Sequence, residues 1–460
     1  MANAAKTVGR RSSMDMTEGN IIKLIIVFAL PILAGQIFQN LYNSVDAIVV
    51  GRYVGTTALA AVSASSDISH LLVGFFTGLS TGCGVLLSRY FGAKNYERLH
   101  DAIHTALCFA LIVGFCMAAL GIVATPLLLH IVDCPADVYA EASSYLRIYL
   151  AGILFTAIYN VGSGILRAVG DSRHPFYYLV ISSIVNIILD LVFVIYLQMG
   201  VMGVALATII SQLTSVTLVF LQLTRTQDVY RVILRHLKLD RELVSEVIDL
   251  GLPAAIQASI ISISNLFVQR YINGFGSSAM AGIGAAKKID KFVGLIAQSI
   301  GQSATTFVSQ NYGAKRLDRA FKSLGICMLI NFTMIAIIGT PIYYMAEKAV
   351  SIFTTDPDSI AYGVGMIHTM MPFYFVQSLN ALFANATRGF GKSKIVMFCS
   401  VFGMVVCRQI FLAITMHLNY DVVNVYRGYP FGWACAAFSV MTYFYFAIWR
   451  KHRHELKKSA

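Results

Sequence analysis

The chain has 460 residues, of which 57% are hydrophobic and 13% are charged. This apolar content is more than one soluble core can bury, so the composition excludes an ordinary soluble domain and indicates a protein that lives in a lipid bilayer. The formal net charge of +12 does not point to nucleic acid, because Lys and Arg collect in alternate connections between hydrophobic segments. We expect no nucleic-acid partner.

Twelve mainly apolar stretches follow one another, each long enough to cross the hydrocarbon as a helix. The predicted spans are 21–47, 58–88, 103–126, 143–166, 176–197, 200–223, 248–271, 280–309, 323–345, 362–385, 395–416 and 430–449. Alternating ten-residue strands are absent, so the predicted fold is that of an all-α polytopic membrane protein. Residues 1–20 are polar and basic without a cleavage pattern, and the first span is expected to be retained.

The basic side chains predict how the chain is oriented in the membrane. Lys and Arg are frequent after the second, fourth, sixth, eighth and tenth spans and in the C-terminal tail, whereas the other connections carry more Asp. Because positive loops stay in the cytoplasm, we expect both termini to be cytoplasmic in the cell's inner (plasma) membrane. Seven of the eight cysteines fall in predicted spans, and no C-x-x-C pair occurs, so neither a disulfide nor a metal site is expected.

The chain contains an internal repeat. Leu30-Pro31 recurs as Leu252-Pro253, and R-Y-F-G-A-K at 89–94 recurs as Q-N-Y-G-A-K at 310–315, with offsets of 222 and 221 residues. Because each copy has six spans, both copies enter the membrane from the same side and form parallel repeats. Such repeats predict two helix bundles around a central cleft, whose binding groups are exposed to each side of the membrane in turn. The predicted parts are a cytoplasmic tail 1–20, bundles 21–223 and 248–449, a cytoplasmic linker 224–247 and a basic tail 450–460.

Polar residues form a stripe in the first span. Gln39, Asn43 and Asp46 follow an i, i+4, i+7 spacing that puts them on one helix face, with Tyr42 beside them. A carboxylate inside the hydrocarbon is costly and usually marks a functional site. The alternative is that Asp46 simply meets water near the outer end of the span.

The fifth span supplies a second carboxylate. Asn186 and Asp190 are one turn apart in otherwise apolar surroundings, and Thr208 in the sixth span adds a hydroxyl. Two neighbouring carboxylates can take up a proton, and together with amide and hydroxyl oxygens they can instead bind a sodium ion. The residue types alone do not distinguish between these two coupling ions. The alternative is a structural hydrogen bond from Asn186 and Asp190 to a neighbouring helix.

These motifs, in this order, resemble the MATE (multidrug and toxic compound extrusion) family over about residues 20–450. The resemblance rests on Pro31 followed by Asp46, the G-A-K turns after spans two and eight, the R-x-x-G-D turn after span four, and N-I-I-L-D at 186–190. The DinF-like branch is closer than the NorM-like branch, because the run 254–263 lacks the acidic residue that NorM-like members carry in helix seven.

The resemblance implies a secondary active efflux transporter and not an enzyme. Its expected substrates are small organic, often cationic and amphipathic compounds, its coupling ion is a proton or sodium, it needs no other cofactor, and it acts as a monomer in the lipid bilayer. The polar cluster of the family's amino-terminal bundle matches Asp46, Asn186, Asp190 and Thr208.

Other residues receive expected roles from their positions. Pro31 is expected to act as a hinge in the first helix, because proline removes a backbone donor. Arg408 lies deep in the eleventh span, where it either lines the cleft, which would favour anionic or zwitterionic substrates, or reaches outward with Gln409. Asp67 and Lys288 are candidates for an outer gate. The candidates for the substrate cleft are Gln39, Tyr42, Asn43 and Arg408.

Three competing functions remain. A lipid-linked saccharide flippase has a similar fold, with additional helices and a strongly basic cavity. An intramembrane prenyl-transferring enzyme would need paired Asp-rich motifs. This chain has a single N-x-x-x-D motif, at 186–190, without a second acidic partner motif. A channel would not explain the duplicated halves and their unequal charges.

Overall fold

The computed structural model describes residues 13–131 and 134–452, which form helices joined by short connections. The chain divides into two compact units. Unit 1 is formed by Ala34–Val247 with residues 13–19, and unit 2 by Asn20–Leu33 with the residues from Ile248 onward. The predicted bundle boundaries at 21–223 and 248–449 stay a prediction.

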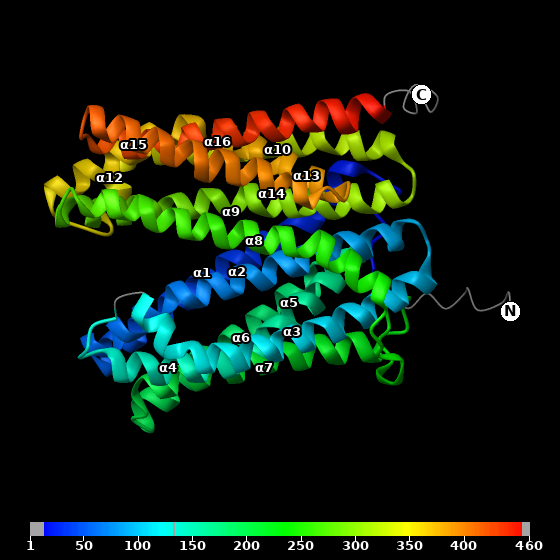
Figure 1. The fold of residues 1–460 in the computed structure, drawn as a ribbon, viewed down its shortest axis with the longest axis horizontal. Helices are drawn as coiled ribbons and strands as arrows, with labels where there is room; N and C mark the ends of the chain where they lie inside the picture. Colours follow the sequence, from blue (N-terminus) through cyan, green and yellow to red (C-terminus); the bar gives the residue numbers. More distant parts are fainter. Residues whose placement is uncertain (1–12, 132–133, 453–460) are drawn as a thin grey trace, which may run out of the picture. The chain divides into compact units, whose positions relative to one another are not determined.

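Unit 1 consists of helices that run side by side (Figure 1). Its α-helices after α1 (Ile21–Val49) are α2 (Thr56–Gly92), α3 (Tyr96–Ile131), α4 (Tyr139–Ala151), α5 (Ile153–Ala168), α6 (Arg173–Leu191) and α7 (Gly200–Arg225). Its shorter elements are the π-helices η1 (Val50–Val54) and η2 (Val192–Tyr196) and the 3-10 helix η3 (Leu234–His236). Helix α5 packs against α2, α3 and α7, and α6 packs against α7.

Unit 2 has the corresponding set of helices. They are α8 (Arg241–Asn273), α9 (Ser277–Gly313), α10 (Leu317–Tyr344), α11 (Ala346–Ser351), α12 (Pro357–Met370), η4 (Met371–Phe373), α13 (Tyr374–Gly389), α14 (Ser393–Val401), η5 (Phe402–Cys407), α15 (Arg408–Leu418), α16 (Val422–Tyr443) and η6 (Phe444–Trp449). Helix α9 packs against α10, α12 and α13, and its buried side chains form much of the core of this unit.

The predicted spans are confirmed as helical segments. Within the described part of the chain, nine helices are individually long and apolar enough to cross a membrane, and the pair α4 and α5, bent by 42°, makes a tenth. The spans predicted at 280–309 and 362–385 form α9 and the pair α12 and α13, which are not among these ten. Both are less apolar, and α9 carries four charged residues between positions 287 and 291.

Backbone conformation follows the sequence repeat. The non-glycine residues Lys94 and Lys315, the last residues of the two G-A-K turns, both have positive φ, at 55° and 58°. Two glycine pairs with positive φ, Gly55 with Gly276 and Gly170 with Gly391, have the same spacing of 221 residues. Because side chains seldom adopt this conformation, its recurrence indicates that the two halves share the same turns.

A buried hydrogen bond is duplicated in the same way. The Ser88 hydroxyl donates to the carbonyl of Ala168 in unit 1, and the Ser309 hydroxyl donates to the carbonyl of Gly389 in unit 2, each at 3.2 Å. These bonds tie the end of α2 to α5 and the end of α9 to α13. The two halves are therefore repeats in structure as well as in sequence.

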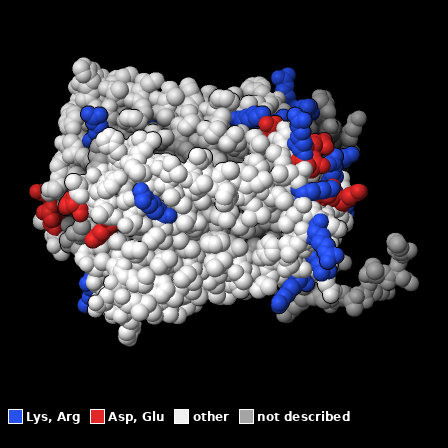
Figure 2. Space-filling model, turned by 60° about the horizontal axis from the view of Figure 1, so that its bottom comes forward, with Lys and Arg blue, Asp and Glu red and all other residues white. Residues whose placement is uncertain are grey.

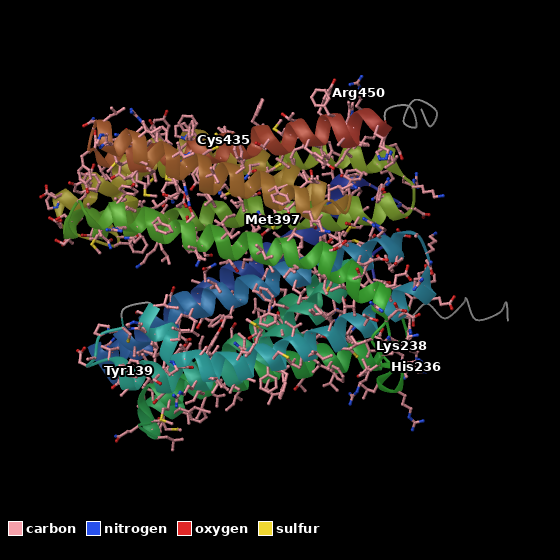
Figure 3. All side chains as sticks on the ribbon, in the orientation of Figure 1. Tyr139, His236, Lys238, Met397, Cys435 and Arg450 are labelled. Atoms are coloured by element: carbon pink, nitrogen blue, oxygen red, sulfur yellow. The ribbon has the colours of Figure 1, made fainter. Side chains whose placement is uncertain are left out.

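The charged side chains are arranged as a membrane protein requires. On the face shown in Figure 2, most of the surface between the helix ends is uncharged, and Lys and Arg gather at one end. In unit 1, Tyr139 lies at one end of the helices, whereas His236 and Lys238 of the basic linker lie at the opposite end (Figure 3). The two kinds of connection predicted from the sequence therefore lie at opposite ends of this unit.

Candidate ion-coupling site

The carboxyl end of α1 is fixed within unit 1 by the π-helix that continues it. Val49 and Val50 are buried, and η1 contacts α2, α7 and η2. Asp46 lies one turn before η1, and Asp190 lies two residues before η2. Short π-helical segments within α-helices often accompany functional sites. The contact between η1 and η2 brings together the ends of the two helices that carry the carboxylates.

Asp46 and Asp190 face each other in unit 1. Their carboxyl groups lie within hydrogen-bonding range of one another. Asp190 is fully buried, and Oδ1 of Asp46 and both carboxyl oxygens of Asp190 have no protein donor. A hydrogen bond between two carboxyl groups needs a proton on one of them, because an ionised carboxylate only accepts. The pair is therefore built to share a proton or to surround a small cation.

Neutral oxygen ligands stand beside this pair. Asn186 is 1% exposed, one turn from Asp190, and neither atom of its amide has a protein partner. The Thr208 hydroxyl is buried on α7, which packs against α6, and donates to the carbonyl of Val204 at 3.0 Å. No group of three or more His, Cys, Asp or Glu in the described part of the chain is placed to hold a metal ion.

Tyrosines surround the carboxylates, and most of them were not predicted. Tyr42 lies close to Gln39 and interacts electrostatically with Asp46, as expected from the first span. On α4, Tyr145 interacts with both carboxylates and stacks on Tyr149, with ring centroids 6.2 Å apart. The only sequence signal for these two residues was their i, i+4 spacing, which is as typical of ordinary helix packing.

The Tyr149 hydroxyl extends the polar region into the middle of unit 1. It lies close to the side chains of Ser69 on α2 and Gln212 on α7. The Gln212 side chain accepts a 2.7 Å hydrogen bond from the hydroxyl of Thr156 on α5. Neutral polar groups of four helices therefore lie near one another in this unit, and such groups can solvate a passing ion.

The remaining candidates are spread more widely. Asn43 is exposed, and Pro31 lies inside α1, which continues through it. Arg408 is buried within unit 2, where both it and Gln409 bind Ser264.

The two candidates for the outer gate are only partly described. Lys288 is exposed, and its ammonium lies 5.2 Å from the centroid of the Phe353 ring. The side chain of Asp67 lies outside the described part of the structure. The predicted gate between Asp67 and Lys288 therefore stays a prediction.

Comparison with solved structures supports the fold. The chain has a TM-score of 0.88 and 23% identity to an outward-facing multidrug resistance MATE family transporter of the MOP superfamily, covering 97% of this chain and 98% of the other. A crystal structure of MATE in the bent conformation has the same TM-score with 24% identity, and the match covers 96% of this chain and 98% of the other.

Comparison by sequence identifies the family. The chain is 26% identical over 445 residues to the probable multidrug resistance protein YoeA of Bacillus subtilis (strain 168), which covers 95% of this chain and 96% of YoeA. The MatE family model matches residues 31–192 and again residues 253–414, once in each repeat. The protein therefore belongs to the MatE family of multidrug efflux transporters, and it is a multi-pass membrane transporter and not an enzyme.

Proposed function

We propose that this protein exports small organic compounds, among them amphipathic cations, by exposing its binding groups to each side of the membrane in turn. Inward movement of a proton or sodium ion through the site of Asp46 and Asp190 drives the export. The protein acts as a monomer in the cell membrane, with both termini in the cytoplasm, because one chain contains both repeats and its basic connections share one side.

One observation carries this proposal: two carboxyl groups lie together in unit 1 without a protein donor for three of their oxygens. Buried polar groups are ordinarily hydrogen-bonded, and leaving several unpaired in one place is costly. A proton or cation that binds and leaves during each cycle compensates for this cost when it is present. The changing charge then alters the stability of the surrounding helices, which couples the ion to the conformation.

The test is accumulation of a fluorescent organic cation in everted membrane vesicles, with proton and sodium gradients imposed separately. We expect either the proton gradient or the sodium gradient, but not both, to drive accumulation of the dye. Asp46→Asn and Asp190→Asn should each abolish gradient-driven accumulation, because an isosteric amide removes the exchangeable charge without opening a cavity. Asp137→Asn, which changes an exposed carboxylate of the same unit, is the matched control and should retain it.

Expression level and elution as a single species in detergent will show whether the variants fold. Gradient-driven export that persists in both Asp46→Asn and Asp190→Asn would refute the assignment of coupling to this pair. Absence of accumulation with either gradient in the wild-type protein would refute ion-coupled export itself.

A further inference from the structure

A second group of charged side chains lies in unit 2, outside the proposed coupling site; Arg408 is buried, and Lys287 and Asp290 are half-buried. It consists of Arg408 on α15 with Lys287 and Asp290 on α9, and we call it the basic cluster. Arg408 is only 3% exposed, although its charge sits in the middle of a membrane-spanning segment. Lys287 is close enough to interact electrostatically with both Asp290 and Arg408. Two positive groups therefore share one carboxylate.

The groups that touch the two cations are neutral. Nη2 of Arg408 donates a 2.7 Å hydrogen bond to the Ser264 hydroxyl, and its guanidinium lies 5.4 Å from the centroid of the Tyr429 ring. Nζ of Lys287 donates to Oε1 of Gln269 at 2.8 Å. Among the described residues, neither cation forms a direct ion pair with a carboxylate.

Asp290 is partly directed elsewhere. It lines a small cavity of about 10 Å³ together with Met366 and Tyr374, and the buried Tyr374 hydroxyl has no hydrogen-bond partner. A space of this size and polarity suits a single water molecule. The carboxylate forms no direct ion pair with Arg408, and the basic cluster, with two cations and one carboxylate, carries an excess of positive charge.

Excess buried charge is costly unless a partner compensates for it. Arg408 also has an unused donor, because its Nε is buried without a partner. A guanidinium binds carboxylate, phosphate or sulfonate through two parallel N–H groups, of which Nε–H is commonly one. The unpaired Nε–H, a second cation nearby and an aromatic ring against the guanidinium form an arrangement that accepts an oxyanion.

The backbone holds Arg408 in this position and leaves space beside Lys287. Arg408 directly follows the π-helix η5, and its Cβ lies next to Gly432 of α16. Gly284 and Gly294 lie on the same face of α9 as Lys287, and a Cβ added at either would meet no atom within 4 Å. This face of α9 is thus not packed against other parts of the protein at those two points.

We propose that the basic cluster binds an anionic group of the transported compound, so that zwitterionic and anionic organic compounds are preferred over simple cations. This inference rests on the proposed export function and specifies its substrates. The organic body of the substrate supplies apolar contacts, and its carboxylate or similar group accepts hydrogen bonds from Arg408 and neutralises Lys287.

Two forms of one dye test the proposal. A rhodamine with a free carboxylate is a zwitterion at neutral pH, and its methyl ester is a cation of almost the same shape. Binding to the purified full-length protein is measured by fluorescence polarisation. We expect the wild-type protein to bind the zwitterion about tenfold more tightly than the ester, as one charge-assisted contact implies.

The variants separate an anion site from a structural role. Arg408→Gln and Lys287→Gln should each remove most of the preference for the zwitterion while changing ester binding less than about twofold. Arg408→Lys should retain part of the preference, because it keeps the charge but not the paired donors. Arg427→Gln, which changes an exposed arginine of α16, is the control and should behave as the wild type.

Equal affinity of the wild-type protein for the two dyes would overturn the proposal, and this measurement needs no variant to fold. An equal loss of affinity for both dyes in folded Lys287→Gln would also overturn the proposal, because that result indicates a structural role of Lys287. Failure of the proposed function gives a different result, namely that neither proton nor sodium drives export of either dye. Asp190→Asn should abolish driven export of both dyes and keep the binding preference.

Discussion

At the scale of single residues, two glycines of α9 show how closely unit 2 is packed. A Cβ added to Gly282 would lie 1.9 Å from the carbonyl oxygen of Ser359, in the first turn of α12. A Cβ added to Gly284 would meet nothing within 4 Å. Gly282 and Gly284 are two residues apart, so they point to different sides of α9. Both have ordinary helical backbone, so only their surroundings differ.

Gly282→Ala is therefore expected to destabilise the protein, whereas Gly284→Ala is not. The first change forces α9 and α12 apart, and overpacking of this kind costs about 1–3 kcal/mol. The second should be neutral or stabilising by up to about 1 kcal/mol, because alanine favours the helix over glycine. Thermal unfolding in detergent measures both. Equal unfolding temperatures for the two variants would contradict the packing described for Gly282.

At the scale of elements, α1 is one of two helices that the division into units splits, the other being α8, which changes unit after Val247. The first residues of α1 group with unit 2, and from Ala34 onward it groups with unit 1. The change falls three residues after Pro31, which leaves one carbonyl of the preceding turn without its helical donor. Asp46, near the other end of the helix, lies in the proposed coupling site. A bend at Pro31 is thus suited to respond to the charge of that site.

Pro31→Ala should lower the turnover of driven export several-fold and weaken its dependence on pH. Alanine restores the missing hydrogen bond and makes the straight form of α1 more stable, so that the bent form is populated less often. The measurement is initial export rate in vesicles over a range of pH, at equal protein content. Unchanged rates and an unchanged pH profile would mean that Pro31 has only a structural role.

At the scale of the whole molecule, the arrangement of the connections predicts which side each loop faces. Cys134 lies in the connection between α3 and α4, shortly before Tyr139. Tyr139 lies at one end of unit 1, whereas His236 of η3, in the basic linker, lies at the opposite end (Figure 3). Burial, with a smaller contribution from the neighbouring carboxylate of Asp137, raises the pKa of the Cys134 thiol. Its thiolate is therefore scarce at neutral pH.

In intact cells, a membrane-impermeant maleimide should label Cys134, and labelling should be lost in Cys134→Ser. Because the reactive form is the thiolate and its pKa is raised, the labelling rate should increase as the pH rises above neutral. In the Cys134→Ser background, Arg235→Cys of η3 should be labelled only after the membrane is opened. Labelling of Arg235→Cys in intact cells would place the linker outside and reverse the proposed orientation.

The sequence alone predicted the helical segments, the internal repeat and the family. These properties depend on local composition, because about twenty apolar residues span the hydrocarbon wherever they lie in the fold, and because repeated turns need the same residues twice. The turns at Lys94 and Lys315 confirm this reasoning. The polar residues of the first and fifth spans were identified for the same reason, since a carboxylate in the bilayer is conspicuous in the sequence itself.

Only the tertiary structure decided which polar groups meet. Asp46 and Asp190 are 144 positions apart, and their contact depends on the π-helices η1 and η2, which have no sequence signature. Tyr145 lies beside them although its spacing is typical of ordinary packing, and Lys287 and Arg408 come together from separate helices. The physical reason is that the cost of a buried charge depends on its partners, and those partners are set by how helices pack and not by the order of residues.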